Sequence, residues 1–321
     1  MRYFVIILAL LVNFIVLGQQ DAQFSNYQTN NFLMNPAVAG SYNYWNAKVG
    51  YRTQWTGMDG GPQTMFGSFH GPIKGIKGKR YRRKKRPHHG FGAMIFSDEA
   101  GAISYNGFSG SYALHTHLNR HYTLSFGASV GMKEFRLDGS KLDFVQTPDD
   151  PEVGDQIYSN VMPDANVGVW LYSEKMFLGL SARNILQSGI EISNGDQVVA
   201  GDYSKLYNHY FITGGIFFDV NTDWAFVPSV MVQHVRPAPV QFDLNGTFWF
   251  QEKIALGFSY RNLDALYVVF EYVHDEKFEF SYAFDFTISE LTKYNNGTHE
   301  VVIGMRFGAP RGKVLCPAKF W

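Results

Sequence analysis

Apolar and polar side chains alternate with a period of two in many segments of this chain. Between Tyr122 and Lys133 every even-numbered position is apolar, and every odd-numbered position is polar or glycine. Residues 277–286 repeat the pattern, with an aromatic side chain at every even-numbered position from Phe278 to Phe286. Successive side chains of a β-strand point to opposite faces of its sheet. The pattern therefore predicts strands with one apolar face and one polar face.

Fourteen segments of this kind follow one another along the chain. Most are about 9 to 13 residues long, which suits a tilted strand crossing a bilayer better than the roughly 5 or 6 residues usual in globular sheets. Their predicted ranges are 44–54, 63–72, 90–97, 103–116, 121–133, 164–173, 175–183, 206–219, 223–235, 240–250, 253–262, 265–273, 276–286 and 298–307.

The connections between these segments alternate in length. Short ones fall at 117–120, 173–174, 220–223, near 252 and near 275, and longer ones at 56–63, 134–163, 184–205 and 287–297. Outer-membrane barrels have short periplasmic turns and longer external loops. Only the connection at 73–89 breaks this rule, because it is long and falls on the predicted periplasmic side. The sequence thus predicts an all-β fold, a transmembrane antiparallel outer-membrane β-barrel of about 14 strands.

A secreted soluble β-sandwich would show the same alternation, with its apolar face in a dry core. Two observations favour the barrel: aromatic residues stand near the strand ends, as in interfacial girdles, and charged residues occupy the polar faces, as in a wet lumen. Pro228 conflicts with its predicted strand, because proline cannot donate a ladder hydrogen bond. The predicted girdle residues are Trp45, Tyr51, Trp55, Tyr122, Trp224, Phe250, Tyr260 and Tyr272.

The first residues predict export. Arg2 precedes an apolar run from Tyr3 to Val12, and Gly18 precedes a polar stretch, an arrangement typical of a signal peptide cleaved before Gln19. A retained membrane anchor is the alternative, because the apolar segment is almost long enough to span a bilayer. The predicted division is a signal peptide at 1–18, an N-terminal periplasmic or plug segment at 19–43, the β-barrel at 44–307 and a C-terminal tail at 308–321.

Composition limits the chemistry that the chain can support. Lys plus Arg and Asp plus Glu number 28 each, so the net charge does not indicate a nucleic-acid partner. Cys316 is the only cysteine, which excludes an internal disulfide and leaves either a reactive thiol or a plain tail residue. The sequence motifs of hydrolases, zinc proteases and nucleotide-binding loops are absent. We therefore expect no enzyme, no cofactor and no nucleic-acid partner.

A strongly basic stretch occupies residues 74–89. In an exported barrel it predicts a periplasmic interaction patch for an acidic partner or lipid head groups. A solvated hairpin insertion without a specific partner explains the same residues. The residues of this predicted patch are Lys77, Lys79, Arg80, Arg82, Arg83, Lys84, Lys85 and Arg86.

Charged residues on the polar faces of the strands predict a charged lumen. The first and last strands meet when a barrel closes, so we expect some of these charges to pair across the lumen and narrow it. Ordinary hydration of a polar interior is the alternative. The predicted lumen charges are Lys48, Arg52, Asp243, Arg261, Glu271, Glu279, Asp285, Glu300 and Arg306.

Three histidines surround one predicted turn, namely His115, His117 and His121. Histidine is a common metal ligand, but no carboxylate or cysteine stands beside them in the sequence. We therefore interpret them as rim histidines rather than as a metal site.

Four stretches are more specific than the alternation. They are DAQFSNYQTNNFLMNPAVAG at 21–40, VGYRTQWTGMDGGPQTMFGSFHGPI at 49–73, SYAFDFTISELTKYNNGTHEVVIGMRF at 281–307, and the terminal CPAKFW. Together they resemble the PorP/SprF family of Bacteroidetes outer-membrane proteins, which belongs to the type IX secretion system and gliding machinery. The basic stretch is longer than the corresponding connection of that family, so the resemblance assigns it no role.

The resemblance implies a non-enzymatic barrel in the cell outer membrane that assists secretion or surface display of a large cargo protein such as an adhesin. The implied partners are outer-membrane lipid, a cargo protein with a type IX C-terminal sorting domain, and other type IX secretion components. The polar lumen also fits an outer-membrane pore for passive or substrate-specific solute transport. A structural adhesin acting through loops 134–163 and 184–205 is a third reading.

The segment ahead of the first strand mixes apolar residues, such as Phe24 and Phe32, with Pro36 and Gly40. We hypothesise that residues 21–43 fold into or under the lumen as a plug.

Overall fold

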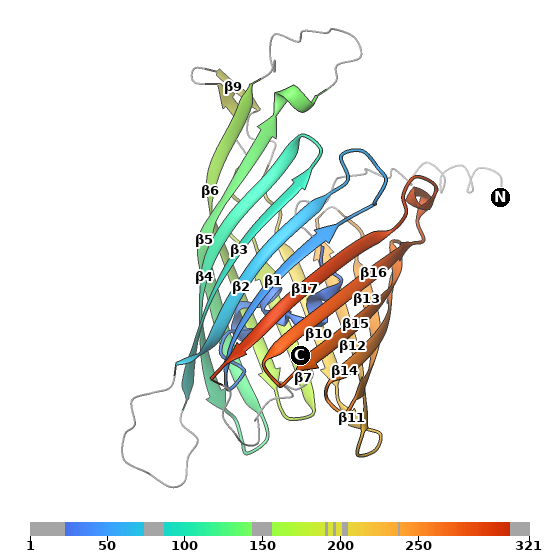
Figure 1. Cartoon of the computed structure of the whole chain (residues 1–321). Coiled ribbons are helices and arrows are strands. Elements are labelled where there is room, and N and C mark those ends of the chain that lie inside the picture. The colour runs from blue at the N-terminus through green and yellow to red at the C-terminus, as the bar shows by residue number, and fades with distance from the viewer. Residues whose placement is uncertain are drawn as a thin grey trace, which may run out of the picture.

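Fourteen antiparallel strands form one closed barrel in the computed structural model (Figure 1). The structure describes residues 23–73, 87–142, 156–189, 192–194, 197–200, 205–236 and 238–308. The predicted signal peptide and the predicted C-terminal tail beyond residue 308 therefore lie outside the described residues.

The strands lie close to their predicted positions. Their bounds are β1 (Trp45–Thr53), β2 (Gln63–Ile73), β3 (His88–Ala100), β4 (Ile103–His117), β5 (Thr123–Asp138), β6 (Ile157–Tyr172), β7 (Met176–Arg183), β10 (His209–Ile216), β11 (Phe218–Asp219), β12 (Trp224–Val235), β13 (Gln241–Phe250), β14 (Ile254–Arg261), β15 (Ala265–His274), β16 (Phe278–Thr287) and β17 (Thr298–Phe307). A separate hairpin of β8 (Ile192–Asn194) and β9 (Gln197–Ala200) was not predicted. Five short 3₁₀ helices complete the fold: η1 (Asn26–Thr29), η2 (Asn31–Leu33), η3 (Pro36–Val38), η4 (Gly139–Lys141) and η5 (Glu290–Lys293).

The sheet closes on itself, because β1 pairs with β17 from Trp45↔Phe307 to Thr53↔His299, and β10 pairs with both β7 and β12. A sandwich would leave edge strands, so the alternative of a soluble β-sandwich is wrong. Among the described residues no helix is both long and apolar enough to cross a membrane.

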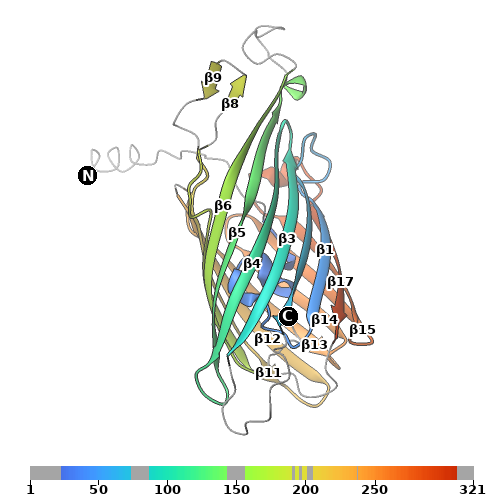
Figure 2. The same cartoon turned by 90° about the vertical axis from the view of Figure 1, so that its left-hand side faces the viewer.

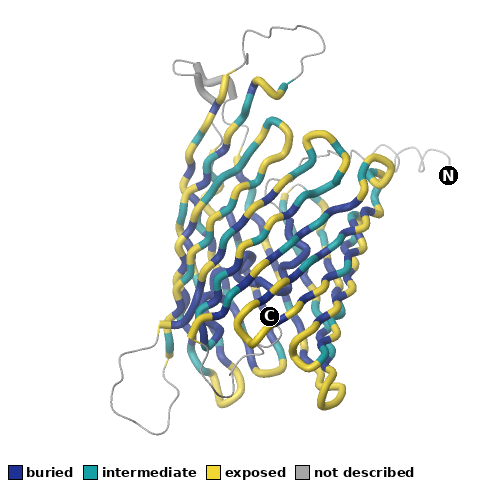
Figure 3. Tube along the Cα trace, viewed as in Figure 1, coloured by how far each residue is buried: buried dark blue, intermediate teal, exposed yellow. Residues whose placement is uncertain are grey.

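The predicted two-faced pattern is confirmed along the strands, as the alternating burial in Figure 3 shows. In β14, exposure alternates from the exposed Ile254 to the buried Arg261 without interruption. Exposed aromatic side chains stand toward both ends of the barrel, among them Trp224 and Tyr272 near one end and Tyr51 and Tyr260 near the other. Apolar side chains that face outward on a closed barrel suit contact with lipid.

The two ends of the barrel differ. We call the end where β1 begins and β17 ends the turn end; the connections 118–122, 173–175, 220–223, 251–253 and 275–277 lie there. We call the other end the loop end; it carries 54–62, 139–156, 184–208 and 288–297, and also the short connections 101–102 and 262–264. The predicted alternation therefore places the long loops together at the loop end, apart from the connection between β2 and β3, which joins these strands at the turn end as predicted.

The predicted loop 134–163 is partly wrong, because much of it is strand. β5 and β6 stay in register from Thr123↔Tyr172 to Asp138↔Ile157, and the hairpin projects beyond the other strands at the loop end (Figures 1 and 2). Charged residues interrupt the apolar face after Lys133, which obscured the strand in the sequence. Phe135 and Met162 are nevertheless buried and pack against Leu206.

Pro228 is accommodated by a break in the neighbouring strand. It pairs with Gly246 of β13. On its other side β10 reaches Gly215↔Ser229, and pairing resumes only at Phe218↔Phe226 of β11. The predicted strand 206–219 is therefore divided at Phe217, where proline has no N–H to offer the ladder.

Candidate functional site

The barrel interior holds a segment of the same chain. Residues 23–42 are all buried, and the blue coil of η1, η2 and η3 lies inside the barrel in two perpendicular views (Figures 1 and 2). We call residues 23–44 the lumen segment. Buried polar groups are costly unless they are hydrogen-bonded, so its many amide side chains need partners on the barrel wall.

A charged cluster near the loop end holds the start of the segment. Arg52 lies 3.0 Å from Glu300 and 2.9 Å from Asp285. Ser25 joins all three residues, because its backbone N–H donates to Glu300 (2.7 Å), its hydroxyl donates to Asp285 (2.6 Å), and that same hydroxyl accepts from Arg52 (2.7 Å). Arg52 and Glu300 are at most 1% exposed. The lumen segment therefore supplies hydrogen bonds that the buried charges require.

A second ion pair lies beside the first. Arg261 and Asp243 are direct neighbours on β14 and β13, 3.0 Å apart. Arg261 also donates to the backbone carbonyl of Phe24 (3.3 Å), and the Tyr267 hydroxyl donates to Asp243 (3.1 Å). Gln23 donates to Gln241, the first residue of β13, at 2.9 Å. The beginning of the lumen segment is thus fixed at the loop end.

A third cluster lies closer to the turn end. Lys48 pairs with Glu279 at 2.7 Å, and Arg306 is hydrogen-bonded to the same carboxylate. Lys48 also donates to the backbone carbonyl of Thr29. Glu271 is 4% exposed and lines a small void next to Thr29. One lysine thereby links the wall to the middle of the lumen segment.

Serine and asparagine side chains hold the middle of the segment. Asn35 donates to the carbonyls of Val169 (3.0 Å) and Leu180 (3.2 Å), while its own carbonyl oxygen accepts from the N–H of Ala37 and caps η3. Ser181 donates to the carbonyl of Met34, and Ser125 to that of Ala37, both at 2.8 Å. Because 3₁₀ helices leave carbonyls unpaired at their ends, these wall hydroxyls replace water there.

Two wall histidines form hydrogen bonds with the C-terminal part of the lumen segment. His115 donates through Nε2 to the carbonyl of Ala39 (2.8 Å), and its Nδ1 accepts from the Tyr172 hydroxyl (3.0 Å). His88 stacks on His115 with 4.3 Å between ring centroids and bonds to the carbonyl of Gly40. His115 lies close to the turn end, as expected of a rim histidine, but it is fully buried against the lumen segment. In the described part of the chain no group of three or more His, Cys, Asp or Glu could hold a metal ion.

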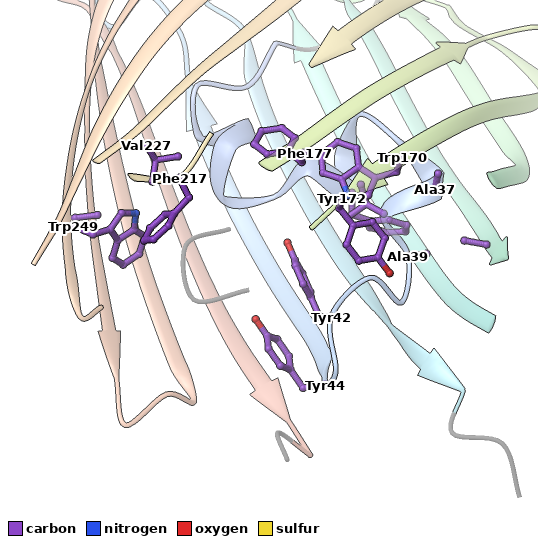
Figure 4. Close-up of a cluster of buried hydrophobic side chains, with 14 of the residues drawn as sticks. Ala37, Ala39, Tyr42, Tyr44, Trp170, Tyr172, Phe177, Phe217, Val227 and Trp249 are labelled. Atoms are coloured by element: carbon purple, nitrogen blue, oxygen red, sulfur yellow. The ribbon is translucent and has the colours of Figure 1, made fainter. Parts of the chain in front are cut away.

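Apolar packing surrounds the same end. Trp170, Tyr172 and Phe177 gather around Ala37 and Ala39 in Figure 4, whereas Phe217, Val227 and Trp249 form a group on another wall. Tyr42 stacks on Tyr44 at 5.3 Å as the chain passes toward β1. This packing adds hydrophobic stabilisation to the polar contacts.

Glycines on the wall let η3 approach closely. A Cβ at Gly127 would lie 2.4 Å from the Cα of Ala37, whereas a Cβ at Gly110 would meet nothing within 4 Å. We expect Gly127→Val to destabilise the folded barrel by about 1–3 kcal/mol through overpacking, measured by urea unfolding in lipid vesicles. Gly110→Val is the control and should change stability little. Equal effects of both substitutions would contradict the close contact with η3.

The structure places all nine predicted lumen charges in the interior, each with at most 9% exposure. The predicted pairing between the first and last strands is confirmed, because Arg52 of β1 meets Glu300 of β17. The pairs do not cross the lumen, however, because they join neighbouring or next-but-one strands of one wall. The lumen segment occupies the space between opposite walls. Sequence reasoning missed Ser25, His88 and Gly127 as contacts of this segment, and the predicted basic patch lies outside the described residues.

One family model covers most of the chain. The family model "Type IX secretion system membrane protein PorP/SprF" matches residues 16–305. No curated protein matches the chain.

Among solved structures, a Pseudomonas aeruginosa FadL homologue is similar with TM-score 0.46 and 9% identity, over 88% of this chain and 93% of that chain. The P. putida toluene transporter TodX has TM-score 0.45 and 11% identity over 85% and 92%. Acinetobacter baumannii Omp33 has TM-score 0.45 and 5% identity over 84% and 99%. We draw nothing about ligands from likenesses at this level.

Proposed function

Because this chain belongs to the PorP/SprF family of type IX secretion system membrane proteins, we propose that it assists secretion or surface display of a large cargo protein such as an adhesin. It acts as a plugged outer-membrane barrel and not as a solute channel or an enzyme. The proposed partners are a cargo protein with a type IX C-terminal sorting domain, other components of the secretion system, and outer-membrane lipid.

The occupied lumen is the observation that carries this proposal. The lumen segment contacts the barrel wall from Gln241 near the loop end to His88 near the turn end, and its residues 23–42 are buried throughout. A cargo protein has no free route through this interior. The barrel therefore acts through surfaces at its ends, where polypeptides can bind.

The loop end offers the larger of these surfaces. Outer-membrane barrels carry their longer loops on the cell exterior, which puts the projecting β5–β6 hairpin there (Figure 2). Ile157 and Val161 of this hairpin are 55% and 62% exposed. An exposed apolar strand beyond the barrel suits contact with another protein.

We expect deletion of the gene to remove one or more cargo proteins from the cell surface. Replacing residues 134–161 by Asn-Gly should do the same, because this exchange removes Ile157 and Val161 while a two-residue turn can join the paired residues Lys133 and Met162. The measurement is protease shaving of intact cells followed by mass spectrometry, together with affinity isolation of the tagged barrel from the outer membrane.

The matched control exchanges a loop-end connection that lies apart from the hairpin, with residues 289–296 replaced by a short glycine-containing turn. It should retain cargo on the surface. If the cell surface proteins of the deletion strain equal those of the wild type, and no secretion component co-purifies, the proposed function is wrong.

A pore for passive or substrate-specific solute transport is the second candidate. The nine charged side chains on the wall favour it, because a polar lumen is typical of conducting barrels. Stable conductance of the full-length protein in a planar bilayer would support the pore over the plugged barrel.

The basic connection between β2 and β3 remains a predicted docking site for an acidic partner or lipid head groups. Exchanging its lysines and arginines for glutamine and repeating the affinity isolation tests this prediction. Loss of a periplasmic partner is the expected result.

A further inference from the structure

The lumen segment runs through the barrel in one direction. Ser25 bonds to Arg52 close to the loop end. Thr29 bonds to Lys48, which lies nearer the start of β1, and Asn30 bonds to Ser68 at 2.8 Å. The order continues with Ala37 at Ser125 and Ala39 at His115, close to the turn end. The chain therefore enters at the loop end and leaves at the turn end, where β1 begins.

The first described residue, Gln23, is fixed at the loop end. Its amide donates to Gln241 at 2.9 Å. The next residue, Phe24, accepts from Arg261 through its backbone carbonyl, and Arg261 in turn pairs with Asp264 at 3.3 Å, in the connection between β14 and β15. Both wall contacts lie where strands meet loop-end connections.

The tether ahead of Gln23 is too short to return to the turn end. Cleavage before Gln19, as predicted, leaves four residues, which reach at most about 14 Å even when fully extended. Strand β1 rises roughly 23 Å between Trp45 and Arg52, which at a tilt of about 40° is still about 18 Å along the barrel axis. The lumen segment itself also occupies that path.

We infer that the amino terminus of the mature protein is presented on the cell-surface side, after passage through its own barrel. Strand β1 begins and strand β17 ends at the periplasmic turn end. The amino terminus therefore lies at the opposite end of the barrel from the start of β1. The other end of the lumen segment stays at the periplasmic turn end, because the backbone continues there from Tyr44 into β1. The inference holds whether or not the barrel binds a cargo protein.

The test is labelling of single cysteines on intact cells with a membrane-impermeant maleimide. Cys316→Ser removes the only native cysteine, and Gln20→Cys then reports on the terminus. The exposed Asp59, replaced by cysteine in the connection 54–62, marks the loop end, and Thr222→Cys in the exposed turn 220–223 marks the turn end. Mass spectrometry of the purified protein establishes where the leader is cleaved.

We expect Gln20→Cys and Asp59→Cys to react on intact cells, and Thr222→Cys to react only after the outer membrane is permeabilised. The inference is overturned if Gln20→Cys behaves as Thr222→Cys does, or if it reacts in neither state. Retention of the leader, or reaction of Thr222→Cys on intact cells, overturns it as well.

Discussion

Deleting residues 23–40 should convert a barrel that does not conduct into one that does. The deletion removes every backbone group that now fills the interior between Gln23 and Gly40, and leaves polar side chains such as Ser125 and Ser181 facing water. Barrels of 8 strands are filled by side chains and those of 16–18 strands hold aqueous channels, so a barrel of 14 strands without its lumen segment should conduct. Single-channel recording in a planar bilayer measures the change.

Full-length protein is the control, and it should give no stable conductance steps. A heat-dependent shift in gel mobility shows whether the deleted protein still folds as a barrel. Should it not fold, the same recording on Gly127→Val, which keeps the complete chain, should show transient openings because η3 is displaced. Unchanged conductance in the folded deletion variant and in Gly127→Val would mean that the segment does not seal the lumen.

Replacing Arg52 by methionine should cost about 3–5 kcal/mol of folding free energy, because Glu300 loses its buried cation and Asp285 keeps only Arg261, 3.9 Å away. Glu300 and Asp285 lie 3.0 and 2.9 Å from the Arg52 guanidinium, and both are almost inaccessible to water. Ser25 loses a hydrogen bond as well, which should loosen the start of the lumen segment. Urea unfolding in lipid vesicles measures the first effect, and faster proteolysis near residue 25 the second.

An exposed ion pair provides the matched comparison. Lys175 lies 3.3 Å from Asp219, with both side chains at least 60% exposed, so Lys175→Met should cost no more than about 1 kcal/mol. Adding Glu300→Gln and Asp285→Asn to Arg52→Met should recover part of the lost stability by removing the uncompensated charges. An Arg52→Met protein as stable as Lys175→Met would show that the buried cluster is not essential.

The strand pattern could be predicted from single residues because each side of a membrane barrel meets a different solvent. Phe278 and Glu279 differ in polarity for that reason alone, and keeping Glu279 inside excludes a one-residue slip of β16 against β17. Hairpin tips were harder to predict, because beyond the bilayer this difference of solvent ends. The β5–β6 projection was accordingly mistaken for a loop.

For the candidate site, the sequence predicted which residues face the interior but not which contacts they make. The nine wall charges of this site could be predicted from their place on polar faces, but their partners could not, because pairing depends on the register between strands. Asp243 lies opposite Arg261 in the register of β13 with β14, and Arg52 lies opposite Glu300 in the register of β1 with β17. Ser25 and Asn35 find their hydrogen-bond partners only when the lumen segment lies inside the folded wall.

By itself the sequence determined the membrane barrel, its approximate strand number and the resemblance to one secretion family, since local alternation and short motifs carry that information. Only the tertiary structure decided that residues 23–44 fill the interior, and in which direction they run. The mixture of apolar and polar residues there suggested a plug from the sequence, but it gave neither the contacts of the segment nor its direction. Burial of these residues becomes favourable only when a closed wall brings serines, histidines and paired charges from distant strands within hydrogen-bond distance of one short segment.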